Sequence, residues 1–502
     1  MQIFRTRDPD FQERWTRLCA RGSDEDEAPV REAAARIVDD VRKRGDAALL
    51  EYTARYDGFA PSSAADLALG PADFARAFHG LPAAARKALK LAADRVAAFH
   101  RRESDALVPS RRDAIGATLG QESRPLARVG LYVPGGTARY PSTVLHTAVP
   151  AKVAGVAEVV ACSPAAKPGP DGQGGQVDAW TLAACHVAGV SRLFRMGGAQ
   201  AVAALAYGTA TVPAVDKICG PGNAYVAAAK RLVYGKVDID MIAGPSEILV
   251  VADGAAAPQE VAADLLAQAE HDVRAVSVLV TSSERLARQA LAEVDRQLAV
   301  LPRQEIASRS IHERGAVVVA RNVAEAVRLA DEFAPEHLAL LLRDAPRWVK
   351  RLSRAGAVFC GTSTPEAVGD YLAGPSHVLP TAGTARFASP LSVATFRRRM
   401  SVLAFTPKAL AEVAPSLDAL AMAEGLEGHA RAVRVRLALA AERAGAPRPR
   451  KTLAREVAAA GAAPRRASPK VAAKAPARQA TSRVAAKAPA RKPARKAAGS
   501  RR

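Results

Sequence analysis

The sequence predicts an α/β protein that contains two doubly wound, Rossmann-like domains. Short apolar runs rich in β-branched residues alternate with longer runs of helical periodicity along most of the chain. This alternation is typical of βαβ units around a parallel sheet. Three glycine-rich loops follow strand-like runs, at 132–142, 196–201 and 219–225. Loops after parallel strands are where such folds bind ligands.

The first series of alternating elements begins at residue 128. Strands are expected at 128–136, where the strand ends in a glycine loop, and at 157–163 and 191–198. Each strand is followed by a run with apolar residues at helical spacing, at 143–156, 178–190 and 199–209. Strand and helix therefore alternate three times, which predicts a parallel sheet.

The same alternation returns in the second half of the chain. Strands are expected at 246–253, 275–282, 315–320, 337–342 and 356–361, with helices between them at 258–270, 283–300, 322–333 and 344–353. Residues 396–445 indicate a strand and helices. We therefore expect a helical arm at 1–25, an α/β domain formed by 26–131 and 240–395, a Rossmann-like domain at 132–239, a small C-terminal segment at 396–445 and a tail at 446–502.

The tail differs sharply from the rest of the chain in composition. It holds 17 of the 71 lysine and arginine residues but one of the 50 acidic residues, so it supplies +16 of the net charge of +21. The octapeptide VAAKAPAR occurs in it twice, and it contains no aromatic residue. Such a segment cannot bury enough apolar surface to fold, so we expect disorder. Non-specific binding of polyanions such as nucleic acid and a purely solubilising role are both open.

The remaining composition indicates a cytoplasmic protein that does not enter a membrane. No apolar run approaches the roughly 18 residues of a membrane span, and the opening stretch MQIFRTRDPDFQERW lacks the apolar core of a signal peptide. The five cysteines are scattered, without a CxxC pair, at positions 19, 162, 185, 219 and 360. This distribution favours free thiols in a reducing compartment over disulfides or a thiolate metal site.

The glycine loops alone are weak evidence for a nucleotide. None of the three contains G-x-G-x-x-G, since GPGNAY has the first two glycines but Tyr225 at the sixth position. Glycines let a backbone approach a ligand, and helix N-termini offer N–H groups to phosphate. Plain tight turns would produce the same pattern and are the alternative.

Four of the nine histidines have polar neighbours that suit metal or acid–base chemistry. Gln268 and His271 lie three residues apart on a predicted helix, so both can reach one ion. The other groups are Glu336 with His337, Asp370 with His377, and Glu424 with His429. An adjacent acid and histidine suit proton transfer, and a His/His/Asp/Gln set is compatible with zinc. Solvated or packed side chains are the alternative, because spacing does not establish proximity.

Eight segments, taken in order, resemble the histidinol dehydrogenase family. They are LYVPGGTARYPSTVLH, GGAQAVAALAYGT, KICGPGNAYVAAAKRLVYG, DMIAGPSEILVVAD, DLLAQAEHD, FAPEHL, GDYLAGPSHVLPT and EGLEGHARA. The resemblance covers roughly residues 1–440 and leaves out the tail. It implies an oxidoreductase that converts L-histidinol to L-histidine through histidinal, the final step of histidine biosynthesis. Two NAD molecules would accept the two hydrides, and one zinc ion would be bound per subunit.

The resemblance also implies roles for individual residues. Zinc would be held by Gln268, His271, Asp370 and His429. Glu336 and His337 would be the acid–base residues. NAD would be contacted by Tyr132, Gln200 and Asn223, one from each glycine loop, which makes 132–239 the NAD-contacting domain. Ser246 and Glu424 would join His337 and the zinc ligands in contacting the substrate, while the role of His377 is left open.

Two further implications concern assembly and mechanism. The family forms an intertwined homodimer, so Glu424 and His429 are expected to serve the site of the opposite subunit. Aldehyde oxidation through a cysteine adduct is an alternative to attack by water. Cys219 and Cys360 lack a histidine partner in sequence, so packing is the better interpretation of both thiols.

Overall fold

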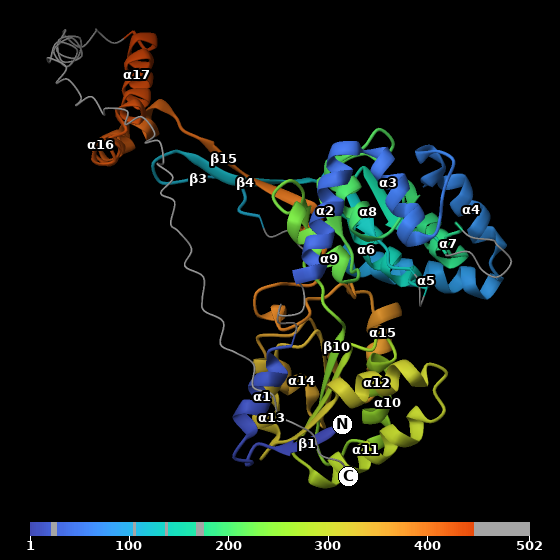
Figure 1. The fold of residues 1–502 in the computed structure, drawn as a ribbon. Coiled ribbons are helices and arrows are strands. Elements are labelled where there is room, and N and C mark those ends of the chain that lie inside the picture. The colour runs from blue at the N-terminus through green and yellow to red at the C-terminus, as the bar shows by residue number, and fades with distance from the viewer. Residues whose placement is uncertain (22–27, 104–106, 136–138, 167–174, 446–502) are drawn as a thin grey trace, which may run out of the picture. The chain divides into compact units, whose positions relative to one another are not determined.

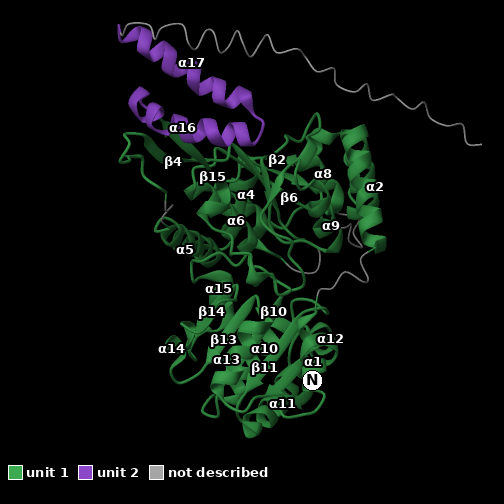
Figure 2. Ribbon diagram, turned by 90° about the vertical axis from the view of Figure 1, so that its left-hand side faces the viewer, with its two compact units in different colours: residues 1–404 green, residues 405–502 purple. Residues whose placement is uncertain are grey.

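The structure, a computed structural model, describes residues 1–21, 28–103, 107–135, 139–166 and 175–445 of the 502-residue chain. The chain divides into two compact units, Met1–Ala404 and Phe405–Arg502 (Figure 2). The tail that is expected to be disordered lies outside the described residues. Along the described part of the chain, no helix is both long and apolar enough to cross a membrane.

The first sheet of the first unit is built around β5 (Arg128–Tyr132) and has the strand order β2-β7-β6-β5-β8-β9. Its neighbouring strands are parallel except for β2, which pairs with β7 in the antiparallel sense. The chain leaves β5 toward β6 on one side and later returns to β8 on the other side. The strands are β2 (Ala68–Leu69), β6 (Glu158–Ser163), β7 (Arg192–Arg195), β8 (Lys217–Cys219) and β9 (Asp238–Ile239).

Helices cover both faces of this first sheet (Figure 1). Successive residues of a strand point to opposite faces, so Val129 and Leu131 of β5 pack with one group of helices while Tyr132 packs with the other. The first group is α4 (Pro71–Gly80), α5 (Ala83–His100), α6 (Pro141–Val153) and α7 (Ala179–Ala188). The second group is α2 (Ala28–Arg44), α3 (Asp46–Tyr52), α8 (Gly198–Tyr207) and α9 (Ala224–Val233).

The second sheet has the order β1-β12-β11-β10-β13-β14, and its neighbouring strands are all parallel. Its strands are β1 (Gln2–Arg5), β10 (Glu247–Ala252), β11 (Val276–Thr281), β12 (Ala316–Val319), β13 (His337–Leu341) and β14 (Ala357–Cys360). One face packs on α1 (Phe11–Cys19), α13 (Val323–Phe333) and α14 (Ala345–Val349). The other packs on α10 (Pro258–Ala269), α11 (Glu284–Leu298) and α12 (Gln304–Arg314). The predicted fold class, with two doubly wound sheets, is confirmed.

Two of the expected domain assignments are wrong. Residues 28–100 were expected to share a domain with 240–395, but helices α2 to α5 pack on the first sheet. The arm at 1–25 is not purely helical, because β1 adds a strand to the second sheet beside β12. An amphipathic helix shows which of its faces is buried, but it carries no signal for which sheet buries that face.

A third, antiparallel sheet has the order β15-β4-β3, with β3 (Arg111–Arg112), β4 (Thr118–Pro125) and β15 (Arg397–Ala404). The second unit contains α16 (Pro407–Ala423) and α17 (Glu427–Arg443), which are joined by an ion pair between Arg434 and Asp418. The strand and helices predicted for 396–445 are therefore present. The other described elements are α15 (Glu366–Tyr371), a π-helical turn at Thr53–Asp57 and 3-10 turns at Ala64–Leu67, Thr384–Arg386 and Val393–Phe396.

Candidate active site

Glu336 and His337 lie at the amino edge of the second sheet, where β13 begins. β10 runs beside β13, with Ile248 paired to His337, so Glu247 at the start of β10 adjoins the two residues. The Glu247 N–H donates to the Glu336 carboxylate at 2.9 Å, and the Glu336 N–H donates to the Glu247 carboxylate at 3.2 Å. This reciprocal contact fixes the backbone at the start of both strands.

A buried arginine holds Glu247 in turn. Arg21 and Glu247 form an ion pair in which the side chains are 6% and 1% exposed. The Arg21 guanidinium also lies 3.3 Å from the centroid of the Phe333 ring and donates to the Phe333 carbonyl at 2.9 Å. The N-terminal arm therefore reaches the site by way of Glu247. Sequence reasoning missed both residues of this pair, because 226 positions separate them.

Burial shifts the acid–base properties of the pair in opposite directions. Desolvation raises the pKa of Glu336 well above its usual range, although a hydrogen bond from Ser246 opposes the change. Desolvation lowers the pKa of His337 to about 4, because a low-dielectric site disfavours the charged imidazolium. His337 is therefore neutral near pH 7 and able to accept a proton. Ser246, a predicted substrate contact, lies within this group.

Gln268 lies in the last turn of α10, and His271 lies in the turn that follows this helix. Gln268 is fully buried in the last turn of the helix. Its amide is satisfied in one orientation, in which Nε2 donates to Glu366 Oε1 at 3.0 Å and Oε1 accepts the Nδ1–H of His271 at 3.2 Å. The same Nε2 also lies 3.0 Å from Nδ1 of His337, so the predicted metal-ligand pair directly adjoins the predicted acid–base pair.

Asp370 lies on α15 and faces the same point. With Nδ1 of His271 acting as a donor, its Nε2 carries the lone pair, and this atom lies 3.9 Å from Asp370 Oδ2. Ligands of a tetrahedral zinc ion with bonds of about 2.0–2.2 Å lie about 3.4 Å apart. The two atoms are therefore close to the spacing of neighbouring ligands of one ion. The carboxyl end of α10, the negative end of its dipole, also favours a cation here.

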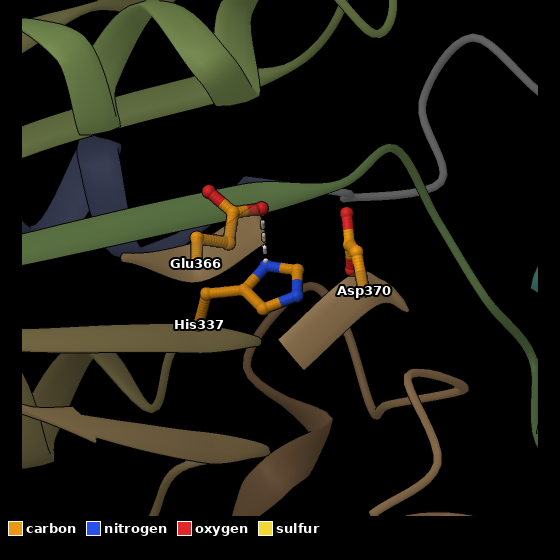
Figure 3. A group of neighbouring side chains, drawn as sticks. All are labelled: His337, Glu366 and Asp370. Carbon is orange, nitrogen blue, oxygen red and sulfur yellow. Dashed lines mark ion pairs between the residues drawn. The ribbon is translucent and has the colours of Figure 1, made fainter. Parts of the chain in front are cut away.

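Glu366, which sequence reasoning missed, completes this group. Ligand atoms of His337, Glu366 and Asp370 all lie within 4.8 Å of one another, and the two carboxylates flank the imidazole (Figure 3). Glu366 Oε1 is 3.4 Å from His337 Nδ1, and burial raises the pKa of Glu366 well above its usual range. Its spacing of four residues from Asp370 on a short helix was the available signal.

His377, whose role was left open, supports Asp370. Nδ1 of His377 lies 3.1 Å from the backbone carbonyl oxygen of Asp370, and the backbone N–H of His377 donates to Nδ1 of His146 at 3.2 Å. The two imidazoles are stacked with centroids 4.3 Å apart. His146 belongs to α6, which packs on the first sheet, so this contact joins the loop after α15 to a helix of that sheet. Sequence reasoning did not foresee this partnership of His146 with His377.

The three residues predicted to contact NAD lie at the carboxyl edge of the first sheet. Tyr132 ends β5, and its hydroxyl accepts the N–H of Gly198 at the start of α8 at 3.0 Å. Gln200 in α8 is 1% exposed, and its Nε2 has no hydrogen-bond partner among the described residues. Asn223 caps α9, with Oδ1 accepting from the N–H groups of residues 225 and 226. β5 and β8 are the strands between which chain order reverses, where doubly wound sheets bind ligands.

The last two predicted site residues belong to the second unit. Glu424 is the C-cap of α16, and His429 lies in the first turn of α17. The N–H of His429 donates to the Leu426 carbonyl at 2.9 Å, and both predicted residues have exposed side chains within their own unit. Their roles as a substrate contact and a zinc ligand stay predictions.

The environment of the cysteines disfavours an activated thiolate. Cys219 lies at the end of β8 and is fully buried, and burial raises its pKa well above the usual range. Burial also raises the pKa of Cys360. Both thiols are therefore harder to ionise than a free cysteine, whereas a nucleophilic cysteine needs the opposite shift.

Comparison with known proteins gives a consistent result. The family model described as histidinol dehydrogenase matches residues 20–437. The histidinol dehydrogenase of Syntrophotalea carbinolica is 50% identical over 439 residues, which cover 87% of this chain and 99% of that protein. That of Geobacter sulfurreducens is 48% identical over 437 residues, covering 87% and 100%. The crystal structure of histidinol dehydrogenase from Elizabethkingia anophelis superposes with a TM-score of 0.80 at 33% identity, covering 87% of this chain and 98% of that one.

Proposed function

The chain belongs to the histidinol dehydrogenase family and is an oxidoreductase of histidine biosynthesis, and we propose that it oxidises L-histidinol to L-histidine in two hydride transfers. The intermediate is the aldehyde histidinal, and two NAD molecules accept the hydrides. The observation that carries this proposal is the contact between the neutral, buried His337 and the group formed by Gln268, His271 and Asp370.

One zinc ion per subunit is proposed to be held by Gln268, His271 and Asp370 together with His429. When bound, it supplies a Lewis acid that orients the imidazole and amine of the substrate and polarises its hydroxyl group. An amide oxygen, two imidazoles and a carboxylate are donors that suit this ion. The 3.9 Å separation between His271 and Asp370 and the carboxyl end of α10 support the assignment.

His337 is proposed as the base of the first oxidation. Its neutral imidazole accepts the hydroxyl proton of histidinol while hydride leaves the adjacent carbon for NAD. Glu336 is proposed as the base of the second oxidation, in which it takes a proton from the water that attacks histidinal. The burial that raises the Glu336 pKa makes its carboxylate a stronger base once it is ionised. Two residues are proposed to contact the substrate. One is Ser246, which hydrogen-bonds to Glu336, and the other is Glu424.

NAD is proposed to bind across the carboxyl edge of the first sheet. Tyr132 and Asn223 follow the two strands of the switch point, and Gln200 lies in α8. The Nε2 of Gln200, which has no hydrogen-bond partner among the described residues, offers a buried donor to a ligand. Glycines at this edge let the cofactor approach the backbone. The protein positions the nicotinamide, and the cofactor carries the hydride chemistry.

A cytoplasmic homodimer is proposed as the working form, with Glu424 and His429 acting in the site of the partner subunit. Mixing His271→Ala with His429→Ala protein tests this sharing. Subunit exchange should restore one intact site per mixed dimer, and a mixture that stays inactive would count against sharing. The tail at 446–502 is proposed to bind polyanions without sequence preference and to have no part in turnover.

The decisive experiment measures NADH formed from L-histidinol by the purified protein. The assay is repeated after treatment with a chelator and again after zinc is added back. Two NADH per histidinol, lost on chelation and restored by zinc, are expected. No turnover by the metal-loaded protein would refute the substrate, and a screen of other small amino alcohols would then identify the one it oxidises.

A further inference from the structure

An ion pair buried beneath the cofactor edge of the first sheet has no part in the chemistry described above. Lys230 of α9 and Asp240, just after β9, have side chains that are 2% and 1% exposed, and their charged groups are in direct contact. Burying two charges is costly, and a buried pair is often no more stabilising than apolar residues of similar size. Stability alone is therefore a weak explanation for this pair.

Both side chains of the pair hydrogen-bond to the backbone of a single residue, Gly220. Asp240 Oδ2 accepts the N–H of Gly220 at 2.7 Å. The Lys230 ammonium donates to the carbonyl oxygen of Gly220 at 3.1 Å. One charge thus holds the peptide group before this glycine and the other charge holds the peptide group after it. Hydrogen bonds with an ionised partner are about twice as strong as neutral ones, so both peptide planes are firmly oriented.

Gly220 needs such support because of its conformation and its position. Its φ is +108°, and a Cβ at this position would lie 2.2 Å from the carbonyl oxygen of Tyr132. The residue therefore has to be glycine, which is the residue that changes backbone conformation most readily. It directly follows β8 and opens the loop that ends at Asn223, the cap of α9. Two residues expected to contact NAD, Tyr132 and Asn223, thus adjoin this glycine or its loop.

We infer that Lys230 and Asp240 are positioning residues that hold the Gly220–Asn223 loop in the conformation that receives the dinucleotide. This inference rests on the proposed use of NAD at this edge. The hydrogen bonds of both side chains to Gly220 are the contacts through which they act on the loop. Losing the pair lets the Gly220 peptides reorient, and each binding event must then restore the correct loop conformation at a cost in affinity.

The test separates positioning from stability with a double substitution. Lys230→Met with Asp240→Leu removes both charges, and replacing a buried pair by apolar residues is often neutral for stability. We expect an unfolding midpoint near that of the wild type but a KM for NAD raised about 10- to 100-fold, the range typical for loss of supporting contacts around a site. The KM for histidinol and the zinc content should not change. A purely structural pair would leave the KM for NAD at the wild-type value.

Matched variants sharpen the comparison. Lys217 and Asp238 form an ion pair at 2.8 Å on β8 and β9, and Lys217→Met with Asp238→Leu removes charges near the same strands without touching Gly220. This control should keep the wild-type KM for NAD. If the apolar double variant does not fold, Lys230→Met with Asp240→Asn, which leaves no unpaired buried charge, is assayed at a temperature where circular dichroism shows it folded. An unchanged KM for NAD in that variant would also overturn the inference.

Direct binding keeps this inference distinct from the proposed function. NADH fluorescence is titrated with wild-type protein and with each variant, without histidinol. If the double variant binds NADH with the same affinity as the wild type, the positioning role alone is overturned. Weaker binding by the double variant supports that role even if histidinol proves not to be the substrate. A wild-type protein that binds no NADH would overturn the cofactor assignment and this inference together.

Discussion

Replacing Arg21 with methionine is expected to destabilise the first unit. The Arg21 and Glu247 side chains are 6% and 1% exposed, so the substitution leaves a carboxylate without its counter-charge in a site that excludes water. Removing one partner of a buried pair typically costs about 3–5 kcal/mol. Methionine still packs against Phe333, but the contact of the guanidinium with that ring and its hydrogen bond to the Phe333 carbonyl are lost. We therefore expect a loss in the upper half of that range.

The same substitution is expected to slow turnover. Glu247 exchanges hydrogen bonds of 2.9 Å and 3.2 Å with Glu336, so a displaced Glu247 shifts the proposed base. A shift of about 1 Å in a positioned group can cost about 100-fold in rate. The expected result is a kcat reduced by about 10- to 100-fold, measured as NADH formation at saturating substrate.

Urea unfolding followed by circular dichroism measures the stability effect. Arg21→Met combined with Glu247→Gln removes the stranded charge and keeps an acceptor for the Glu336 N–H, so at least half of the lost stability should return. The exposed pair of Arg5 with Glu284 supplies the control, since Arg5→Met should leave the unfolding midpoint unchanged within error. An Arg21→Met protein with wild-type midpoint and wild-type kcat would refute the reasoning.

Four further predictions follow from the same contacts. Burial raises the pKa of Asp264 to about 6, so the native state binds this proton more tightly than the unfolded chain does. The stability that the protonated form contributes is therefore full below about pH 4 and is lost as the pH rises through 6. Asp264→Asn should therefore stabilise the protein by up to about 3 kcal/mol at pH 8 but not at pH 4; an equal effect at both pH values in urea unfolding would contradict this. Glu336→Gln should slow the oxidation of supplied histidinal about 10²- to 10⁴-fold, more than it slows the oxidation of histidinol; equal slowing of the two steps in stopped-flow NADH traces would exclude the assigned role. Cys219→Ala and Cys360→Ala should each retain activity in the steady-state assay, whereas a thousand-fold loss with the fold intact would favour a thiol adduct. Removing residues 446–502 should abolish retention on a polyanion column and leave kcat unchanged; a collapse of turnover would show that the tail has another role.

The helix and strand pattern was predictable because it depends on the spacing of apolar residues at neighbouring positions of the sequence. Residues 248–252 form one continuous apolar run, and β10 is buried on both faces, as a central parallel strand should be. The pairing of Gln268 with His271 was also predictable, since three residues on a helix bring two side chains to one face. Tyr132, Gln200 and Asn223 were named from the family resemblance, and each lies in a glycine loop that follows a predicted strand. Their contact with NAD stays a prediction.

Other parts of the candidate site carry no local signal. Arg21 and Glu247 look like ordinary charged residues in sequence, and their near-complete burial arises only when the N-terminal arm packs beside α13. Lys230 and Asp240 likewise carry no local signal in the sequence. Ten residues separate them, and only the loop geometry shows that they share Gly220 as a partner. Buried charges are rare enough that sequence reasoning assigns such residues to the surface.

The sequence by itself determined the two doubly wound sheets, the family and the residue types available for chemistry, because periodicity, turn residues and motifs are properties of neighbouring positions. Only the tertiary structure decided that the proposed acid–base pair lies at the amino edge of the second sheet, that helices α2 to α5 belong to the first sheet, and that buried charges hold the loops and strands around each site. These outcomes depend on which distant segments exclude water from one another. Burial and proximity of this kind are properties of the packed chain and not of any stretch of it.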